Sequence, residues 1–362
     1  MSKNLNIVIS GGGTGGHIYP AIAIANELKE QFPKAQILFV GASGKMEMEK
    51  VPKAGYDIIG LPIAGFNRSN MLANLSFPYK LIKSLTKAYR TLKDFRPDVA
   101  IGVGGYASGP TLLIAKLIGV KSVIQEQNSY AGVTNKILAK WASKICVAYP
   151  NMEKFFPAEK VVFTGNPVRN DIIDSKVSKE KALAHFKLKT DKKTLLIIGG
   201  SQGARSINLA IEAGIDELVK QGLQVIWQTG KVFRRTKNAL DGTYISDFIY
   251  EMEFAYQAAD VVISRAGALS VSELCLTGCP SILVPFPNAA EDHQTMNALS
   301  LVEKKAALLV RDSEVGSDLI NVCLALVNDN ALQQSLRKNI AGFAKPNAAK
   351  EIIEQIKQVL ET

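Results

Sequence analysis

The feature of this sequence that most constrains its fold is a recurring unit: an apolar run, a glycine-rich turn and an amphipathic stretch. It first occurs as LNIVIS at 5–10, GGGTGG at 11–16 and a helical pattern from Pro20 to Leu28. The same unit returns in KTLLIIGGSQGA at 193–204. Strands that alternate with helices in this way are typical of βαβ units with a parallel sheet buried on both faces. The sequence therefore predicts an α/β fold.

The recurrence also predicts the domain organisation. A chain of 362 residues is expected to form two domains at roughly 100–200 residues each. We expect a doubly wound, Rossmann-like domain at 1–165, a second one at 166–340, and a C-terminal helix within 341–362 that packs back toward the first. Ligands should bind outside the carboxyl ends of the strands, in a central cleft that the two domains face. Further β-rich runs lie at 36–41, 98–105, 121–127, 144–149, 160–165, 223–230, 244–249, 260–267 and 280–286.

The charge of the chain is concentrated in its first half. The net charge is +10, and residues 1–165 hold 20 basic and 10 acidic side chains, whereas the remainder holds 23 of each. This asymmetry indicates an anionic partner for the first half. A nucleic acid, an anionic membrane surface and an acidic substrate all remain open at this point.

Composition excludes several classes of protein. A hydrophobic content of 47% excludes wholesale disorder. No run approaches the roughly 18–20 apolar residues that span a bilayer, and no secretory signal peptide is expected, so membrane contact would be peripheral. The scattered cysteines fit a reducing cytosol, and we expect them to be buried rather than metal-bound. They are Cys146, Cys275, Cys279 and Cys323.

The first glycine loop matches G-x-G-x-x-G through Gly11, Gly13 and Gly16. Such glycines let backbone N–H groups approach an anion at a helix N-terminus. A dinucleotide site also expects an acid about 20 residues on, to hold a ribose. The second strand instead ends VGASGK at 40–45, without an acid. The pattern therefore favours an anionic ligand other than NAD or FAD.

His17 follows this loop at the start of the first helix. The positive end of a helix disfavours a protonated imidazole, so we expect a neutral ring there. A neutral histidine is a competent general base near pH 7. Position alone supports a capping or packing role equally well.

Three more glycine loops follow expected strands, at 102–110, 199–204 and 264–273. In the last of them, a helix N-terminus can face a diphosphate after Gly267. Glu273 lies within the first two turns of that helix. Its carboxylate could accept two hydrogen bonds from a ribose diol, or it could serve only as an acid near the helix start.

Seven motifs in this order carry a family resemblance: GGGTGGH (11–17), GVGGYASGP (102–110), EQN (126–128), GNPVR (165–169), GGSQGA (199–204), SRAGALSVSE (264–273) and HQTMNA (293–298). Together they resemble the bacterial peptidoglycan N-acetylglucosaminyltransferases, which make lipid II from lipid I. The resemblance covers almost the whole chain. It implies a two-domain GT-B fold, with UDP-N-acetylglucosamine held mainly by the second half and the lipid-linked acceptor by the first.

The resemblance also implies roles for individual residues. Ile249 matches a backbone contact to uracil, Glu273 a contact to ribose and Gln294 a contact to sugar hydroxyls. We expect the acceptor diphosphate near Gly13, Gly104, Gly105 and Tyr106. The full set that matches donor-binding positions is Thr14, Gly15, Gly16, Asn128, Arg169, Ser201, Ile249, Ala268, Leu269, Ser270, Val271, Ser272, Glu273 and Gln294.

The implied reaction is an inverting transfer of N-acetylglucosamine to the C4 hydroxyl of the muramyl-pentapeptide of lipid I. Its transition state should resemble an oxocarbenium ion. We expect His17 to accept the hydroxyl proton, while backbone amides, Ser201 and Arg169 stabilise the leaving diphosphate. No D-x-D triplet occurs. We therefore expect no required cofactor or bound metal, and a divalent cation is expected at most to stimulate the reaction.

The stretch 66–96 carries seven bases and one acid, Asp94. From Lys80 its helical pattern places apolar side chains on one face and bases on the other. This pattern fits a helix packed on the sheet, and beside the apolar segment 71–78 it also fits contact with anionic lipid. The residues on the apolar face are Leu81, Ile82, Leu85, Tyr89 and Leu92. The expected membrane contacts are Leu72, Leu75, Phe77, Lys80 and Lys83.

The implied partners are UDP-N-acetylglucosamine, lipid I, the anionic inner-membrane surface and proteins of cell-wall synthesis. The expected location is peripheral, at the cytoplasmic face of the bacterial inner membrane. Three alternatives are a related nucleotide-sugar transferase with a different lipid or other acceptor, an NAD enzyme and a nucleic-acid-binding protein. The absence of a helix-turn-helix, RNP or zinc module disfavours the last, and no nucleic-acid partner is expected.

Overall fold

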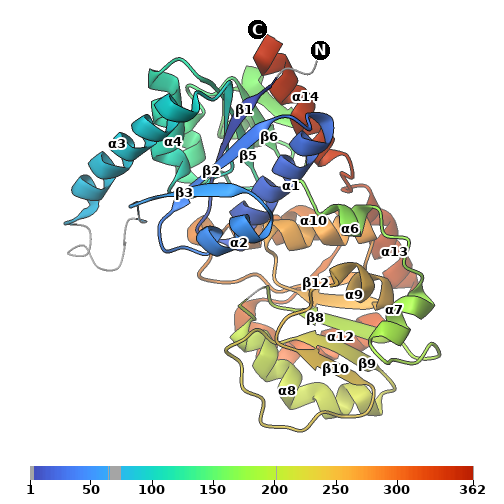
Figure 1. Ribbon diagram of the computed structural model, residues 1–362. Helices are drawn as coiled ribbons and strands as arrows, with labels where there is room; N and C mark the ends of the chain where they lie inside the picture. Colours follow the sequence, from blue (N-terminus) through green and yellow to red (C-terminus); the bar gives the residue numbers. More distant parts are fainter. Residues whose placement is uncertain (1–3, 64, 66–74, 201, 362) are drawn as a thin grey trace. The chain divides into compact units, whose positions relative to one another are not determined.

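The computed structural model describes residues 4–63, 65, 75–200 and 202–361. It divides the chain into two compact units: Met1–Val168 with Pro346–Thr362, and Arg169–Lys345. Each unit is built on one parallel sheet with helices packed against it (Figure 1). The predicted α/β fold with two doubly wound units is confirmed.

The first unit has a seven-stranded sheet of order β3-β2-β1-β4-β5-β6-β7. The chain runs outward from β1 to β3 and then crosses back to place β4 beside β1. The loops after β1 and β4 therefore emerge together at the point where the strand order reverses, which is where open α/β sheets bind ligands. The strands are β1 (Asn6–Ser10), β2 (Gln36–Ala42), β3 (Asp57–Leu61), β4 (Val99–Gly102), β5 (Lys121–Glu126), β6 (Lys144–Val147) and β7 (Val161–Phe163).

The C-terminal helix belongs to the core of this first unit. Ile352 and Ile356 of α14 (Ala348–Glu361) are fully buried in one cluster with Ile7 and Ile9 of β1. Figure 1 shows α14, in red, beside α1. The final helix thus returns to the first sheet after the chain has completed the second unit. The other helices of this unit are α1 (Gly15–Gln31), α2 (Glu47–Lys53), α3 (Phe77–Phe95), α4 (Ser108–Leu117) and α5 (Val133–Leu138), with short 3₁₀ turns at Met152–Lys154 and Ala158–Lys160.

Helix α3 differs from its expected pattern in two respects. It begins at Phe77, before the amphipathic pattern that is evident from Lys80, with Pro78 in its first turn where a missing N–H costs nothing. The face expected to be apolar is only partly buried, since Ile82 and Tyr89 are 65% and 43% exposed whereas Leu92 is buried. The buried stripe instead runs through small and polar residues as well as leucine, because α3 packs closely on α4. Its buried residues are Ser84, Ala88, Thr91 and Leu92.

The second unit repeats the plan with a six-stranded parallel sheet of order β10-β9-β8-β11-β12-β13. Here the strand order reverses between β8 and β11, so the loops after these two strands emerge together. Trp227 of β9 is fully buried in the core of this unit and donates its indole N–H to Asn208. The strands are β8 (Thr194–Ile198), β9 (Gln224–Gln228), β10 (Thr243–Ser246), β11 (Val261–Ser264), β12 (Ser281–Leu283) and β13 (Leu308–Leu309).

Eight helices cover this sheet within the described part of the second unit. The longest, α8, begins directly after the 199–204 glycine loop, as the recurring unit predicts. The helices are α6 (Asn170–Ile173), α7 (Lys179–His185), α8 (Arg205–Lys220), α9 (Met252–Ala258), α10 (Ala268–Thr277), α11 (His293–Val302), α12 (Val315–Asn328) and α13 (Asn330–Ala341), with 3₁₀ turns at Ala290–Asp292 and Asp312–Glu314.

Candidate active site

In the first unit, the two glycine loops at the reversal of strand order touch each other. A Cβ on Gly105 would lie 2.4 Å from the carbonyl oxygen of Gly12, closer than any real contact. Both residues have positive φ, +84° for Gly105 and +148° for Gly12, which glycine adopts readily. Ser108 joins the loops further by donating to Ser10 O at 2.7 Å and to Gly104 O at 2.9 Å. Glycine is therefore required here for close backbone approach as well as for the turn.

His17 lies between these two loops. Its Nδ1 is 3.0 Å from Gly12 O and 3.3 Å from Thr14 Oγ1. On the other side of the ring, a Cβ on Gly104 would meet His17 Nε2 and Cδ2 at 2.9 Å. Because a carbonyl oxygen only accepts hydrogen bonds, a hydrogen bond to Gly12 O requires a proton on Nδ1, and in a neutral ring the lone pair is then on Nε2. This geometry suits a general base that acts through Nε2.

Other expected residues of the first unit gather at the same sheet edge. Thr14 is exposed, and Gly15 and Gly16 open helix α1. Tyr106 is 49% exposed, and its ring lies against Gly65. A Cβ added to Gly65 would lie 2.2 Å from Cζ of the Tyr106 ring. The amide of Gly13 already donates to a protein carboxylate, that of Glu47, at 2.9 Å. A diphosphate near Gly13 would therefore need other donors.

Glu126, the last residue of β5, organises the EQN motif. It is 2% exposed, and its Oε1 accepts from the backbone N–H of Asn128 at 3.1 Å. Its Oε2 accepts from Gly132 N at 3.0 Å and from Asn135 Nδ2 at 2.9 Å. Gln127 donates to Val103 O at 2.8 Å and so ties the motif to the second glycine loop. The structure thus places Asn128 at the same edge as His17, through Glu126, a buried acid of the EQN motif to which the sequence analysis gave no role of its own.

In the second unit, helices α8 and α10 begin at the same edge of the sheet, after the neighbouring strands β8 and β11. Their positive N-termini therefore point toward one region. The 199–204 loop packs tightly on the residue that follows β9, since a Cβ on Gly203 would lie 2.0 Å from Thr229 O. Ser201, expected near the diphosphate, lies outside the described residues.

Arg265 is a residue of this edge that the sequence analysis missed. It is 7% exposed and donates to the carbonyls of Val284 and Pro285 at 3.2 and 3.0 Å. Its guanidinium also bonds Asp312 and Ser206 Oγ, and Ser206 is in the first turn of α8. This buried cation fixes the start of α8 relative to the loop that leads into α10. An arginine directly after a buried strand was the signal available in the sequence.

Glu273 is held in the second turn of α10 by two partners. Tyr256 Oη donates to its Oε2 at 2.8 Å, and Arg169 Nη2 lies 3.9 Å from its Oε1. Burial raises the pKa of Glu273, although the Arg169 guanidinium and the Tyr256 hydrogen bond act in the opposite direction. Burial and the Glu273 charge together raise the pKa of Tyr256 well above its usual value. Glu273 is thus an oriented carboxylate beside a cation.

The other expected donor residues differ in which atoms they present. Ala268 and Val271 are buried, so a ligand would reach them only through their backbone, whereas Leu269, Ser270 and Ser272 are partly exposed. The N–H of Ile249 donates to Gln228 Oε1 at 2.9 Å, and Phe286 N donates to Gln294 Oε1 at 3.0 Å. A ligand contact at Ile249 would therefore use its carbonyl oxygen, and one at Gln294 its side-chain N–H₂.

Comparison with known proteins assigns each of the two units to a known domain family. The glycosyltransferase family 28 N-terminal domain matches residues 7–147, and the family 28 C-terminal domain matches residues 194–356. A Parabacteroides distasonis protein is 53% identical over 99% of both chains. Its name is UDP-N-acetylglucosamine–N-acetylmuramyl-(pentapeptide) pyrophosphoryl-undecaprenol N-acetylglucosamine transferase. The chain belongs to glycosyltransferase family 28.

A Flavobacterium psychrophilum protein of the same name is also 53% identical to this family 28 glycosyltransferase, over 99% of both chains. The crystal structure of Acinetobacter baumannii MurG is 30% identical, with a TM-score of 0.78, over 98% of this chain and 99% of that one. The resemblance to the peptidoglycan N-acetylglucosaminyltransferases and the GT-B fold class are both confirmed.

The described part of this family 28 glycosyltransferase lacks two features. Among those residues, no helix is both long and apolar enough to cross a membrane. Nor do the described residues contain a group of three or more His, Cys, Asp or Glu side chains placed to hold a metal ion. All four cysteines are buried, and none forms a disulfide.

Proposed function

We propose that this protein transfers N-acetylglucosamine from UDP-N-acetylglucosamine to the C4 hydroxyl of the muramyl-pentapeptide of lipid I, with inversion, and so forms lipid II. The observation that carries this proposal is 53% identity, over 99% of the chain, to transferases named for that donor and acceptor. The alternative of a different acceptor is not favoured, because these relatives share both halves of the chain.

His17 is proposed to take the proton of the attacking hydroxyl. Support comes from the ring position, with Nδ1 bonded to Gly12 O at 3.0 Å and Nε2 beside Gly104. A base that accepts the proton as the C–O bond forms raises the nucleophilicity of the hydroxyl. The acceptor would lie along the two glycine loops of the first unit, with Tyr106 at their exposed rim.

The second unit is proposed to bind the donor and to stabilise the leaving diphosphate. Backbone N–H groups at the starts of α8 and α10, together with Arg169, would meet the charge that grows on the β-phosphate. Glu273 would accept hydrogen bonds from the ribose, the Ile249 carbonyl would contact uracil and Gln294 would bind sugar hydroxyls. With these donors, the proposed reaction needs no resident cofactor or metal, and a divalent cation would at most stimulate it.

A transfer assay tests the whole proposal. Labelled UDP-N-acetylglucosamine and a soluble lipid I analogue should give a disaccharide product with the β configuration. Unlabelled UDP-glucose and UDP-N-acetylgalactosamine should compete weakly. Transfer to other lipid-linked acceptors, with none to the lipid I analogue, would overturn the acceptor assignment and leave the donor assignment intact.

Replacing Glu273 with glutamine should weaken donor binding and yet stabilise the fold at neutral pH. Loss of the charge weakens the hydrogen bonds to ribose, so KM for UDP-N-acetylglucosamine should rise about tenfold. Because burial raises the pKa of Glu273, the wild-type fold is favoured by protonation, and that advantage is lost as pH rises through the folded pKa. Glutamine does not ionise, so its Tm should exceed that of the wild type at pH 7.

The two readouts for Glu273→Gln separate the roles of this side chain. The difference in Tm should vanish below about pH 4, where the wild-type carboxyl is protonated in both states. Asp171→Asn serves as the control, because Asp171 is also near Arg169, at 3.8 Å, but is 44% exposed. An unchanged KM in Glu273→Gln would rule out the ribose contact.

The protein is also proposed to bind the cytoplasmic face of the inner membrane peripherally, through α3 and the residues before it. Exposed apolar side chains lie here among bases: Leu75 is 79% exposed, Tyr79 67% and Ile82 65%. Lys83 Nζ lies 5.8 Å from the centre of the Tyr79 ring. Apolar side chains beside lysines suit an anionic bilayer surface. Leu72, another expected contact, lies outside the described residues.

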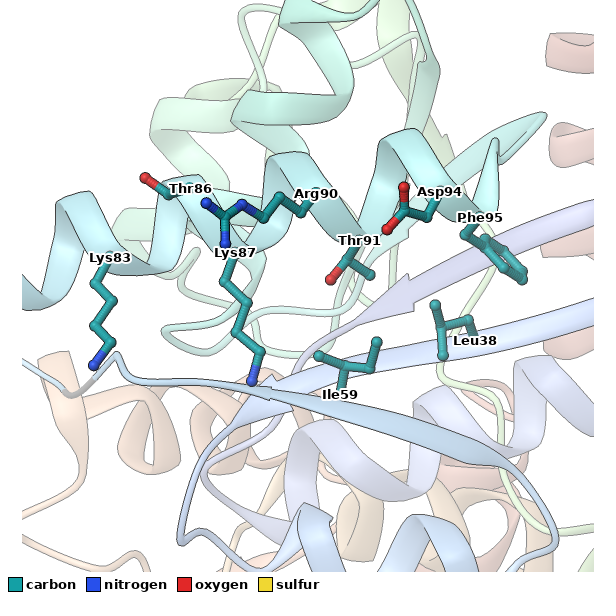
Figure 2. Close-up of a pocket in the computed structure, with 9 residues that line it drawn as sticks. All are labelled: Leu38, Ile59, Lys83, Thr86, Lys87, Arg90, Thr91, Asp94 and Phe95. Carbon is teal, nitrogen blue, oxygen red and sulfur yellow. The ribbon is translucent and has the colours of Figure 1, made fainter.

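A groove of about 770 Å³ beside α3 adds to this surface. Figure 2 shows Lys83, Lys87 and Arg90 along the helix, with Ile59 of β3 on the opposite side. Lys87 also donates to Gly60 O at 2.8 Å, which orients it toward the strand edge. Three bases and one acid, Asp94, thus line the groove together with apolar side chains, and this excess of bases beside apolar groups suits an anionic phospholipid surface. Proteins of cell-wall synthesis are proposed as further partners, with no site assigned to them.

Ile82→Asp should lower binding to phosphatidylglycerol vesicles by at least about tenfold, because burying an isoleucine contributes roughly 1.5–3 kcal/mol. Sedimentation with vesicles measures the bound fraction, and added salt should lower it for the wild type. Val232→Asp is the matched control, since Val232 is 78% exposed but belongs to the second unit. Binding that ignores both salt and Ile82→Asp would contradict the proposed surface.

A further inference from the structure

A single peptide group links a buried carboxylate to His17. The peptide between Gly12 and Gly13 accepts from His17 Nδ1 through its C=O, at 3.0 Å. The N–H of the same peptide donates to Glu47 Oε2, at 2.9 Å. The order is therefore carboxylate, peptide, imidazole. All of these groups lie in the first unit.

Glu47 is held firmly in this place. It is 1% exposed, it is the first residue of α2, and its second oxygen accepts from the backbone N–H of Ala42 at 2.9 Å. Two glycines make room for it: a Cβ on Gly12 would lie 2.2 Å from its Oε1, and one on Gly41 would lie 2.6 Å from its Cγ. The carboxylate thus joins the end of β2 to the glycine loop after β1.

The electrostatic consequence follows from how a peptide transmits polarisation. A negative charge at the N–H end of a peptide repels electron density toward the carbonyl oxygen. That oxygen then becomes a stronger hydrogen-bond acceptor. A stronger acceptor at Gly12 O holds the proton on His17 Nδ1 and fixes the plane of the ring. The lone pair of the neutral imidazole is then confined to Nε2, the nitrogen beside Gly104.

We propose that Glu47 is a positioning residue that sets the tautomer and orientation of His17 through the Gly12–Gly13 peptide. The inference rests on the proposed function, in which His17 is the base. Glu47 acts here as an orienting carboxylate acts on a catalytic histidine, with one peptide group interposed. A role as a brace of the loop alone would leave the tautomer unchanged when the charge is removed.

Glu47→Gln tests the proposal, because the glutamine nitrogen does not accept and one of the two backbone N–H groups loses its partner. Nitrogen-15 NMR of the whole enzyme reports the tautomer directly, and the chain has only three histidines. We expect the wild type to show His17 protonated at Nδ1 and the variant to show a mixture. The value of kcat should fall about 10- to 100-fold, with KM for the donor changed less than threefold.

Glu49→Gln is the matched control, two residues along the same helix, with a 63% exposed side chain paired to Lys53. It should leave the tautomer and kcat unchanged. The inference is overturned if Glu47→Gln keeps the wild-type tautomer, whatever its Tm. It is also overturned if the wild type itself is protonated at Nε2, a measurement that needs no variant to fold. Full turnover by His17→Ala would instead defeat the base role and leave the tautomer result standing.

Discussion

His17→Ala should lower kcat by about 10²- to 10⁴-fold, the contribution of a positioned general base. The ring lies between two loops with Nδ1 bonded to Gly12 O and Nε2 beside Gly104, so alanine removes the proton acceptor without opening the core. KM for UDP-N-acetylglucosamine should change little, because the proposed donor contacts lie mainly in the second unit. Steady-state kinetics with both substrates varied separate the two constants.

A stability measurement should accompany the kinetics of His17→Ala. His17 is partly exposed, and its loss should shift Tm by no more than a few degrees. His185→Ala is the control, since His185 belongs to the second unit and packs there on Phe186 and Phe254. Turnover within about tenfold of wild type in His17→Ala would make the base role untenable.

Gly105→Ala should be the most damaging conservative change in the first unit. Alanine at a φ of +84° is strained, and its Cβ would lie 2.4 Å from Gly12 O and 3.0 Å from Gly12 N, both backbone atoms. The two loops must then separate, and the peptide that binds His17 moves with them. We expect a loss of about 2–4 kcal/mol in the free energy of unfolding and a fall in kcat of at least tenfold.

Gly119→Ala isolates the contribution of the backbone conformation. Gly119 has a φ of +82°, nearly that of Gly105, but a Cβ there would meet nothing within 4 Å. It should therefore cost only about 1–2 kcal/mol and leave kcat unchanged. Denaturant unfolding of both variants gives the comparison. Equal losses in the two would show that strain in φ, rather than contact between the loops, accounts for the requirement at Gly105.

Much of the fold could be predicted from the local pattern of apolar residues and glycines in the sequence. The strands before each glycine loop were predicted because burial on both faces makes them continuous apolar runs. The strand β3, DIIGL, was missed because it is a short edge strand, and β13 has only two residues. The exposure of Ile82 and Tyr89 was also missed, because a helical wheel gives which residues share a face but not where the neighbouring helix ends.

The candidate site was predictable only in part. The first glycine loop and His17 are contiguous in sequence, at 11–17, so the motif alone places them together. Arg265 and Glu47 were not found, because their partners are distant along the chain: Gly13 is 34 residues from Glu47, and Asp312 is 47 from Arg265. No spacing rule relates such pairs, since they meet only once the strands have paired.

The sequence by itself therefore determined the α/β class, the two halves, the glycine loops and the family. These depend on short-range periodicity and on motifs, which survive without knowledge of what packs against them. Only the tertiary structure decided which side chains of the last helix join the core of the first unit, and that Glu47 reaches the peptide beside His17. The reason is that β2 lies beside β1 in the sheet, so the carboxylate after one strand meets the loop after the other.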